Sequence, residues 1–585
     1  MINNNLDLNP AEVAAKEALE QVMSCIKDHR SFVFEAGAGA GKTYSLIQCL
    51  RHVIENKGKE LLKNNQTIAC ITYTNVAKDE IKARTDSHPV ILSETIHSFC
   101  WSILKCFQPD LRVILPSLER WSDKINDVNE IKSKAVIYDL GYPSINDFEI
   151  KLGHDDVIDL MVKFMEKEKF RTLFCNRYPI LFIDEYQDTN KNFANSLKQY
   201  FIENGEGPLI GFFGDHWQKI YGSTSCGKFE HPNLKVIGKK ANFRSEKNIV
   251  DFLNKMRSEL PQKESDPNSR GSLIVYHTNN WQGTRRTGQH WDGDLPPEYA
   301  HLYLDTVRKK LLENGWDFSA EKTKILMLTH NVLADEQGYR HLADVFSRTE
   351  YYIKKEDSYI AYFADILEPA CIAYENKKYG EMFAVLGGRT PTIHRHEDKV
   401  QWANDMNELI KVRHEGTIRQ VINLLARTKH PRLSEKVESN ESKYRKLLEN
   451  SENTPEDLHF IERIQRLDNV PYREVIELVK FIEDKTPFAT EHGVKGAEFE
   501  NVLVVVGRGW NQYNFGQMLE WVKTGIPTGK QDSFERNRNL FYVACSRPMK
   551  RLALLFTQKL SNAAIETLSD WFGAKVIHSL PNLPL

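Results

Sequence analysis

One segment restricts the possible folds of this chain more than any other: residues 34–43 read Phe-Glu-Ala-Gly-Ala-Gly-Ala-Gly-Lys-Thr. Its apolar start predicts a strand, its glycines a tight loop, and its end the first turn of a helix. Such a loop points backbone N–H groups at phosphate oxygens, while the lysine reaches the β- and γ-phosphates and the threonine holds Mg²⁺. The segment predicts an α/β domain with a nucleotide site made by Gly37, Ala38, Gly39, Ala40, Gly41, Lys42, Thr43 and Tyr44.

A second segment supplies the carboxylates that such a site needs. Residues 181–189 read Leu-Phe-Ile-Asp-Glu-Tyr-Gln-Asp-Thr, an apolar strand that ends in acidic side chains. At the end of a buried strand, Asp184 can hold the metal ion and Glu185 can activate water. Together the two segments predict an enzyme that hydrolyses a nucleoside triphosphate with Mg²⁺.

The composition is that of a globular protein with several domains. The chain has 585 residues, 41% apolar and 27% charged, and this length suggests about three or four domains. Its net charge of −2 gives no support to nucleic-acid binding, so any such binding must come from a local groove. Nine scattered cysteines, no apolar run of membrane length and no secretory start predict a cytoplasmic protein without a membrane partner.

Apolar runs of strand length alternate with helical patterns along most of the chain. Continuous apolar runs are typical of parallel strands with helices on both faces. The first four runs would share a sheet with the phosphate-binding loop, and the last three would form a second sheet. The predicted strands are residues 31–35, 67–72, 180–183 and 209–213, then 324–328, 501–506 and 552–556.

Further motifs follow the phosphate-binding loop in a fixed order. They include Ile-Thr-Tyr-Thr-Asn at 71–75, Glu-Thr-Ile-His-Ser-Phe at 94–99, Gly-Asp-His-Trp-Gln-Lys-Ile-Tyr at 214–221, Ala-Asn-Phe-Arg-Ser at 241–245, Thr-Glu-His-Gly-Val-Lys-Gly-Ala-Glu-Phe at 490–499 and Leu-Phe-Tyr-Val-Ala-Cys-Ser-Arg at 540–547. This ordered set closely resembles the superfamily 1 DNA helicases of the UvrD/Rep/PcrA group. The resemblance covers residues 8 to 560, although the helical stretches match the family in position only.

The resemblance implies an α/β fold with two RecA-like P-loop NTPase domains, each carrying a mainly helical insert. ATP and Mg²⁺ would bind in the cleft between the domains, and single-stranded or tailed duplex DNA would run across their tops in a 3′-to-5′ motor. The implied divisions are residues 1–100 and 171–238 for the first motor domain, 101–170 for its insert, 239–345 and 485–585 for the second, and 346–484 for its insert.

The family's catalytic roles transfer to residues of this chain. Lys42, Thr43 and Asp184 with Mg²⁺ would neutralise the phosphates, because phosphoryl transfer depends on positioning and charge neutralisation. Glu185 would take the proton of the attacking water. Gln218 is similar in placement to the family's sensor of the γ-phosphate.

Other roles come from residues of the implied second motor domain. Arg244 and Arg547 resemble cationic fingers that reach the nucleotide when the cleft closes, although either could instead form a surface ion pair. Phe243 resembles the aromatic residue that stacks on adenine. Glu498 resembles a carboxylate that contacts the nucleotide from the second domain.

The resemblance also implies DNA contacts. Tyr73 and Tyr221 stand where the family places aromatic residues, and stacking on a ring tolerates any base. Asn75, His97 and His492 resemble polar contacts to the strand, and each could alternatively be a structural residue.

Two positions depart from the family pattern. The Trp and Arg usual after the tyrosine are missing, because Gly222-Ser-Thr-Ser follows Tyr221; Trp217 lies close in sequence but could equally be a packing residue. Glu12 replaces the glutamine that reads adenine. Because an ionised carboxylate only accepts hydrogen bonds, selectivity for ATP is in doubt.

The expected setting is DNA repair and processing or antiphage defence. Little sequence follows Arg547, and none of it resembles the nuclease domain fused to some relatives, so we expect any nuclease to be a separate partner. Trimmed relatives occur in antiphage systems such as Gabija, where a UvrD-like protein works beside an OLD-type nuclease. An alternative is a subunit that senses DNA and nucleotide for such a nuclease with little unwinding of its own.

Overall fold

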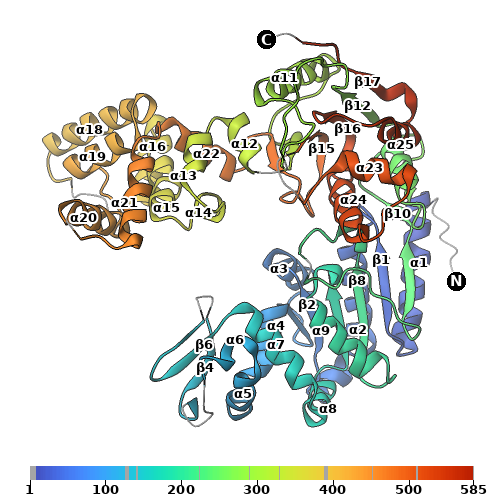
Figure 1. The fold of residues 1–585 in the computed structure, drawn as a ribbon. Coiled ribbons are helices and arrows are strands. Elements are labelled where there is room, and N and C mark those ends of the chain that lie inside the picture. Colours follow the sequence, from blue (N-terminus) through green and yellow to red (C-terminus); the bar gives the residue numbers. More distant parts are fainter. Residues whose placement is uncertain are drawn as a thin grey trace.

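The computed structural model of this protein describes residues 8–125, 131–139, 143–222, 224–288, 290–328, 330–387, 393–450, 452–508 and 512–583. Two six-stranded sheets organise these residues, and a mainly helical segment projects from each (Figure 1). Among the described residues, none of the helices combines the length and apolar character needed to cross a lipid bilayer.

The first sheet is parallel, with the strand order β3-β2-β7-β8-β1-β9. All residues of β1, β2, β7 and β8 are buried, which explains their unbroken apolar sequences. The four strands predicted for this sheet are confirmed. Its elements are β1 (Phe32–Ala36), β2 (Ile68–Thr72), β3 (Ile91–Thr95), β7 (Ile180–Asp184), β8 (Leu209–Gly214) and β9 (Lys235–Lys239), with the helices α1 (Pro10–Lys27), α2 (Lys42–Lys63), α3 (Asn75–Arg84) and α9 (Lys191–Leu197).

The chain between β3 and β7 shares a hydrophobic core with the first sheet. Trp121 is fully buried there, together with apolar residues of β2 and β7. The segment is mainly helical, as predicted, but it also contains a three-stranded sheet, β4-β6-β5, that the sequence analysis did not predict. The segment consists of α4 (Ile96–Leu104), α5 (Gln108–Ile114), α6 (Glu119–Ser122), β4 (Ala135–Tyr138), β5 (Ser144–Ile145), β6 (Glu149–Leu152), α7 (His154–Met165) and α8 (Glu168–Arg177).

The second sheet is also parallel, with the strand order β14-β13-β15-β16-β12-β17. The three strands predicted for it are confirmed as β13, β15 and β16. Its elements are β12 (Ser272–His277), β13 (Thr323–Met327), β14 (Phe488–Thr490), β15 (Phe499–Val506), β16 (Pro548–Phe556) and β17 (Ile577–Ser579), with α10 (Lys247–Met256), α11 (Pro297–Glu313), α23 (Phe515–Thr524), α24 (Gln531–Cys545) and α25 (Asn562–Phe572).

The two sheets repeat one topology. Numbered by their order along the chain, the strands of each sheet follow the same spatial order, third, second, fourth, fifth, first and sixth. In this common order β12 and α11 of the second sheet stand where β1 and α2 stand in the first. The two sheets are thus two RecA-like units. A short pair of strands, β10 (Ala241–Asn242) and β11 (Lys263–Glu264), lies between them in the sequence.

The helical segment between β13 and β14 has a hydrophobic core of its own, built from residues between Ala334 and Val479. Buried ion pairs join its helices: Arg413 Nε lies 2.9 Å from Glu368 Oε1. Figure 1 shows this segment extending away from both sheets. Its helices are α12 (His330–Gln337), α13 (Arg340–Val345), α14 (Glu350–Ile353), α15 (Ser358–Tyr362), α16 (Glu368–Glu375), α17 (Tyr379–Leu386), α18 (His396–Glu415), α19 (Ile418–Thr428), α20 (Glu435–Glu449), α21 (Pro455–Asp468) and α22 (Arg473–Ile482).

Candidate nucleotide site and nucleic-acid interface

The phosphate-binding loop connects β1 to α2, as the sequence predicts. Gly39 and Gly41 have positive φ angles of 73° and 69°, in the left-handed region that favours glycine. Lys42 is the first residue of α2, and Thr43 follows it. Free N–H groups at a helix N-terminus together with a lysine side chain form a site for an anion.

The loop lies against residues that follow the first sheet in the sequence. The backbone N–H of Ala38 donates to Tyr542 Oη (3.2 Å), and the backbone N–H of Phe243 donates to the carbonyl oxygen of Gly39 (2.8 Å). A Cβ atom at Gly39 would lie only 2.8 Å from Cβ of Arg244. The candidate nucleotide site therefore lies at the seam between the two RecA-like units.

The predicted metal ligand and general base lie beside the lysine. Asp184 ends β7, and Glu185 follows it with a φ of 49°. Lys42 Nζ lies 2.5 Å from Glu185 Oε1 and 4.0 Å from Asp184 Oδ1. A phosphate that recruits Lys42 must therefore compete with Glu185 for the ammonium group.

These charges set one another's pKa values. Burial would lower the pKa of Lys42, but the charges of Glu185 and Asp184 raise it above its usual value. Burial raises the pKa of Asp184 to about 6, although Lys42 opposes this shift. Burial would also raise the pKa of Glu185, but the nearby Lys42 and Lys495 lower it to about 2. At neutral pH both carboxylates are therefore ionised and able to bind a cation or accept a proton.

The predicted sensor Gln218 is linked to the general base by hydrogen bonds. Gln218 Nε2 donates to Asp215 Oδ2 (2.8 Å), and the backbone N–H of Asp215 donates to Gln187 Oε1 (3.0 Å). Gln187 Nε2 in turn donates to Glu185 Oε2 (2.5 Å). The sequence analysis assigned no role to Asp215 or Gln187, although both belong to motifs that it identified.

The two predicted arginine fingers both reach the seam. Arg244 follows β10 and lies against Gly39, and its Nε donates to Glu498 Oε2 (3.0 Å). Arg547 is buried, and its guanidinium donates to the carbonyl oxygens of Val543 (2.9 Å) and Ala497 (3.3 Å). Burial and the charge of Arg244 lower the pKa of Arg547. A buried cation whose hydrogen bonds go to neutral acceptors favours an incoming anion.

Two aromatic side chains border the loop on the side where a base would bind. A Cβ atom at Gly41 would lie 3.7 Å from Cδ2 of Phe243 and 4.0 Å from Cβ of Tyr44. Both rings are exposed. Beneath them lies Lys239, which the sequence analysis missed: it is buried, its Nζ donates to Ser45 Oγ (2.8 Å), and burial lowers its pKa to about 8.

Glu12 has a structural role at the start of α1. Its backbone N–H donates to Asn9 Oδ1 (2.9 Å), and its carboxylate accepts from the backbone N–H of Asn9 (2.9 Å). This reciprocal pair is a capping box at the start of α1. The Glu12 side chain is thereby already engaged as a hydrogen-bond acceptor.

Three of the predicted DNA contacts converge on one pocket. Tyr73, His97 and Tyr221 line a cavity of about 260 Å³ at the carboxyl ends of strands in the first sheet, together with Asp184 and Asp188. The rings of Tyr73 and Tyr221 are stacked, with centroids 5.6 Å apart and an interplanar angle of 17°. The pocket thus combines two aromatic rings with the carboxylates of Asp184 and Asp188.

The other two predicted DNA contacts lie outside that pocket. Asn75 is exposed at the start of α3, close to Tyr73 in sequence. His492 lies in the loop after β14, where its Nε2 is 3.0 Å from Tyr513 Oη. The same loop contributes Lys495, a residue that the sequence analysis did not select. Lys495 lies over the ring of Tyr221, 5.1 Å from its centroid.

Lys495 also contacts the candidate sensor Gln218 beside the nucleotide site. Its Nζ donates to the backbone carbonyl oxygen of Gln218 (2.8 Å) and forms an ion pair with Asp188. Trp217, the neighbour of Gln218, is buried between the guanidinium of Arg538, 3.9 Å from the ring centroid, and the ring of Tyr542. These contacts favour the interpretation of Trp217 as a packing residue.

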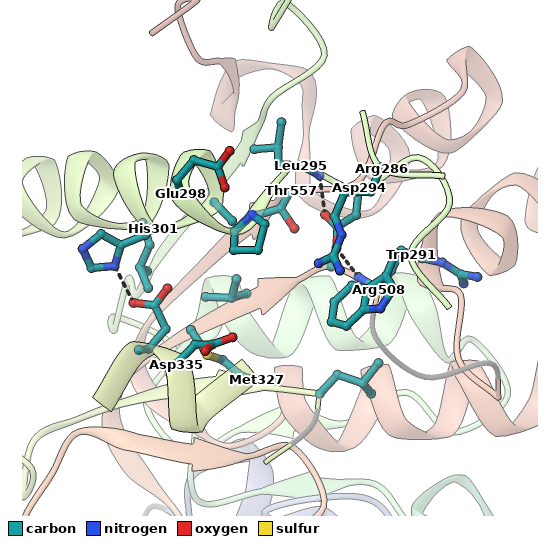
Figure 2. Close-up of a pocket in the computed structure, with 17 residues that line it drawn as sticks. Arg286, Trp291, Asp294, Leu295, Glu298, His301, Met327, Asp335, Arg508 and Thr557 are labelled. Carbon is teal, nitrogen blue, oxygen red and sulfur yellow. Dashed lines mark hydrogen bonds and ion pairs between the residues drawn. The ribbon is translucent and has the colours of Figure 1, made fainter. Parts of the chain in front are cut away.

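The second RecA-like unit has a pocket at the position equivalent to the nucleotide site. It has a volume of about 310 Å³ and lies at the carboxyl ends of β13 and β15, beside the start of α11 (Figure 2). Asp294 is held there by the backbone N–H groups of Leu295 (2.9 Å) and Arg508 (2.7 Å). Four carboxylates line this pocket against two arginines, which disfavours a polyphosphate: they are Asp294, Glu298, Asp335 and Glu336, with Arg286 and Arg508.

Comparisons with known proteins agree with this geometry. The AAA domain family matches residues 19–224. The Gabija protein GajB of Bacillus cereus (strain HuB5-5) is 26% identical to this chain, and the match covers 95% of this chain and 97% of that protein. The ATP-dependent DNA helicase PcrA of Staphylococcus epidermidis is 25% identical to this chain, and the match covers 41% of this chain and 40% of that protein. The ATP-dependent DNA helicase Rep of Buchnera aphidicola is 25% identical over 38% of this chain and 40% of its own length.

Among solved structures, the Pif1 helicase of Candida albicans aligns with 58% of this chain at 14% identity and a TM-score of 0.26, which is too low to support a shared arrangement of domains. The sequence matches and the repeated sheet topology confirm the resemblance to the UvrD/Rep/PcrA helicases. The chain therefore resembles the helicase-like P-loop ATPases of the UvrD/PcrA type.

Proposed function

We propose that this chain is an ATP-dependent translocase or helicase that moves 3′ to 5′ along single-stranded DNA. One observation carries the proposal: the phosphate-binding loop lies at a seam to which both RecA-like units contribute charged side chains. Lys42, Asp184 and Glu185 come from the first unit, and Arg244 and Arg547 from the second. We further propose that residues 1–100 with 171–238 and residues 239–345 with 485–585 act as the two motor domains, and that residues 101–170 and 346–484 act as their inserts.

Hydrolysis would begin with an exchange of partners at Lys42. The ammonium group now paired with Glu185 would turn to the β- and γ-phosphates, while Thr43 and Asp184 would hold Mg²⁺, whose charge neutralises the phosphate oxygens. Glu185 would then be free to accept the proton of the attacking water. Gln218 would orient the γ-phosphate.

Closure of the seam would complete the site. Arg244 lies against the loop, and Arg547 is held by backbone carbonyl oxygens that leave its charge available to an anion. A finger of this kind contributes about 10³–10⁵ in rate, so turnover would depend on how the two units meet. Phe243, Tyr44 and Glu498 would contact the rest of the nucleotide.

Single-stranded DNA would bind across the pocket of Tyr73, His97 and Tyr221, with Asn75 and His492 as further contacts. Stacking on tyrosine rings suits a protein that must pass along any sequence. Lys495 supports coupling between the two sites, because it touches Tyr221 and the backbone of Gln218.

We infer a setting in antiphage defence from the similarity to a Gabija protein over nearly the whole chain. A separate nuclease, of the OLD type in such systems, would then be the protein partner, and the complex would act in the cytoplasm. One departure favours a DNA-sensing regulatory subunit as a second candidate: Gly222 stands where the family's channel continues with a tryptophan.

Two assays on the purified chain test the proposal. ATP hydrolysis is measured with and without single-stranded DNA, with Lys42→Ala as the inactive control. Strand displacement is measured on duplexes with a 3′ or a 5′ tail. DNA-stimulated hydrolysis with displacement only from the 3′ tail supports the helicase. Stimulated hydrolysis without displacement favours the regulatory subunit, and hydrolysis indifferent to DNA contradicts both.

A further inference from the structure

A buried arginine of the second RecA-like unit penetrates the first unit beneath the phosphate-binding loop. Arg257 follows the end of α10, a helix that begins shortly after Arg244 and packs on β12, β16 and α25. Only 3% of its surface is exposed. Its guanidinium lies over the rings of Trp217 and Tyr542, 5.3 Å and 5.7 Å from their centroids.

The guanidinium meets two buried carboxylates of the first unit. Arg257 Nη1 donates to Asp215 Oδ1 (2.6 Å), and Arg257 Nη2 lies 3.7 Å from Glu35 Oε2. Asp215 is fully buried. Burial would lower the pKa of Arg257, but the charge of Asp215 raises it above its usual value. Removing one partner of such a buried pair leaves a charge without compensation, so the two side chains hold each other in place.

Asp215 is also the residue that positions the candidate sensor. Its Oδ2 accepts from Gln218 Nε2 (2.8 Å), and its Oδ1 accepts from the backbone N–H of Trp217 (3.0 Å). Its own N–H reaches Gln187, which donates to Glu185. Asp215 thus connects Arg257 to the sensor through its carboxylate and, through its backbone N–H and the side chain of Gln187, reaches the candidate general base.

A metal ion is a poorer explanation of this cluster. Ligand atoms of Glu35, Asp215 and His216 lie within 4.8 Å of one another. However, Arg257 already supplies the positive charge between the carboxylates, and Glu35 Oε1 accepts a hydrogen bond from Tyr186. The arginine therefore occupies the place that a cation would take.

We propose that Arg257 is a positioning residue for the γ-phosphate sensor, through which the second unit sets the orientation of Gln218 by way of Asp215. This inference rests on the proposed function of Gln218 and deepens it. Movement of α10 relative to the first sheet would pull on Asp215 and turn the sensor amide. Recognition of the γ-phosphate by Gln218 would then depend on the position of the second unit.

The test compares the affinities for a non-hydrolysable ATP analogue and for ADP by fluorescence titration with Mg²⁺. The variants are Arg257→Gln, Gln218→Ala and the two combined. We expect Arg257→Gln and Gln218→Ala to reduce the preference for the triphosphate to a similar extent, by about tenfold, the effect of one charge-assisted hydrogen bond. Affinity for ADP should stay unchanged, and the combined variant should lose no more than either single one.

Two further variants separate positioning from general structure. Arg257→Lys keeps the charge and should recover part of the preference. Arg538→Gln is the matched control. Arg538 also lies over the ring of Trp217, but its guanidinium donates to Asn539 and not to Asp215. This control variant should lower the melting temperature without changing the preference. If Arg257→Gln does not fold, either a wild-type preference in Arg257→Lys or losses that multiply in Arg257→Lys/Gln218→Ala would overturn the inference.

A folded Arg257→Gln protein with the wild-type preference would overturn it directly, as would losses that multiply in the combined variant. These titrations need neither hydrolysis nor DNA. They can therefore fail while DNA-stimulated hydrolysis succeeds, and the reverse, so the two proposals stand or fall separately.

Discussion

At the scale of single residues, the candidate site is a balance among three charges. Lys42 lies between Glu185 and Asp184, and burial opposes the ionisation of both carboxylates. The lysine compensates Glu185 more strongly, at 2.5 Å against 4.0 Å. The two carboxylates therefore differ in pKa although they are adjacent in sequence.

This difference predicts how hydrolysis depends on pH. With a pKa of about 6, Asp184 gains a proton as the pH falls through that value, whereas Glu185, with a pKa of about 2, stays ionised. Protonated Asp184 cannot hold Mg²⁺, so we expect the rate to fall about tenfold per unit below pH 6. Because Mg²⁺ competes with the proton, higher Mg²⁺ should move this limb to lower pH in steady-state assays. An acid limb that is independent of Mg²⁺ would contradict the assignment.

Replacing the general base should separate binding from chemistry. Glu185→Gln keeps the shape of the side chain but cannot accept the proton, and the expected loss of turnover is about 10²–10⁴-fold. Lys42 would lose its ion-pair partner, so affinity for the nucleotide should be maintained or increased. Titration with a fluorescent ATP analogue measures this affinity. Glu483→Gln, at the end of the helical insert, serves as the control. Normal turnover in Glu185→Gln would refute the role.

At the scale of elements, the carboxyl ends of parallel strands gather the functional side chains. Asp184 ends β7, Tyr73 follows β2 and Asp215 follows β8. Since neighbouring parallel strands end at the same edge of a sheet, residues far apart in sequence meet there. The aromatic pair Tyr73 and Tyr221 belongs to this edge.

That placement predicts a selective loss of DNA binding. Tyr221→Ala should weaken binding of single-stranded DNA by ~1–3 kcal/mol, the usual contribution of one stacked base. Hydrolysis without DNA should remain unchanged, because the ring packs against Tyr73 and Lys495, neither of which is proposed to contact phosphate. Tyr379→Ala removes a similarly exposed ring from α17 and should have no effect. Fluorescence anisotropy with labelled oligonucleotides measures both, and equal affinities for wild type and Tyr221→Ala would remove Tyr221 from the interface.

The elements also show what the sequence alone could predict. The central strands β1, β2, β7 and β8 were predictable because burial on both faces demands unbroken apolar runs. The edge strand β9, Lys-Val-Ile-Gly-Lys, was missed because a lysine at each end and a glycine interrupt the apolar run, although Lys239 is buried. The small sheet of the first insert was missed because strands of two to four residues carry too little periodicity.

Some residues of the candidate site could likewise be predicted from the sequence, and others could not. Lys42, Asp184 and Glu185 belong to contiguous motifs, so their types and spacing were sufficient to find them. Arg257 was beyond sequence reasoning, because its partners Asp215 and Glu35 come from distant strands and only the folded seam brings them together.

At the scale of the whole molecule, the seam is where DNA and nucleotide can influence each other. Lys495 spans it, since it comes from the second half and contacts Tyr221, Gln218 and Asp188 of the first. Burial raises the pKa of Asp188 to about 6, opposed by the charge of Lys495. A contact of this kind is suited to transmit strand binding to the sensor.

Replacing Lys495 should therefore uncouple the two sites. In Lys495→Gln we expect the stimulation of hydrolysis by DNA to fall by about fivefold or more, a typical coupling energy between sites. The rate without DNA should change less than the stimulation does. Lys550→Gln, which pairs with Glu500 on the surface of the second unit, is the control. Paired rate measurements with and without DNA check this, and undiminished stimulation in Lys495→Gln would place the coupling elsewhere.

The acidic pocket at the start of α11 has a consequence for stoichiometry. Because carboxylates line the equivalent pocket of the second unit, we expect one ATP-binding site per polypeptide, the one in the first unit. An isolated monomer must therefore respond to ATP concentration hyperbolically, with a Hill coefficient of about one. Any sigmoidal response would have to arise from contacts between copies.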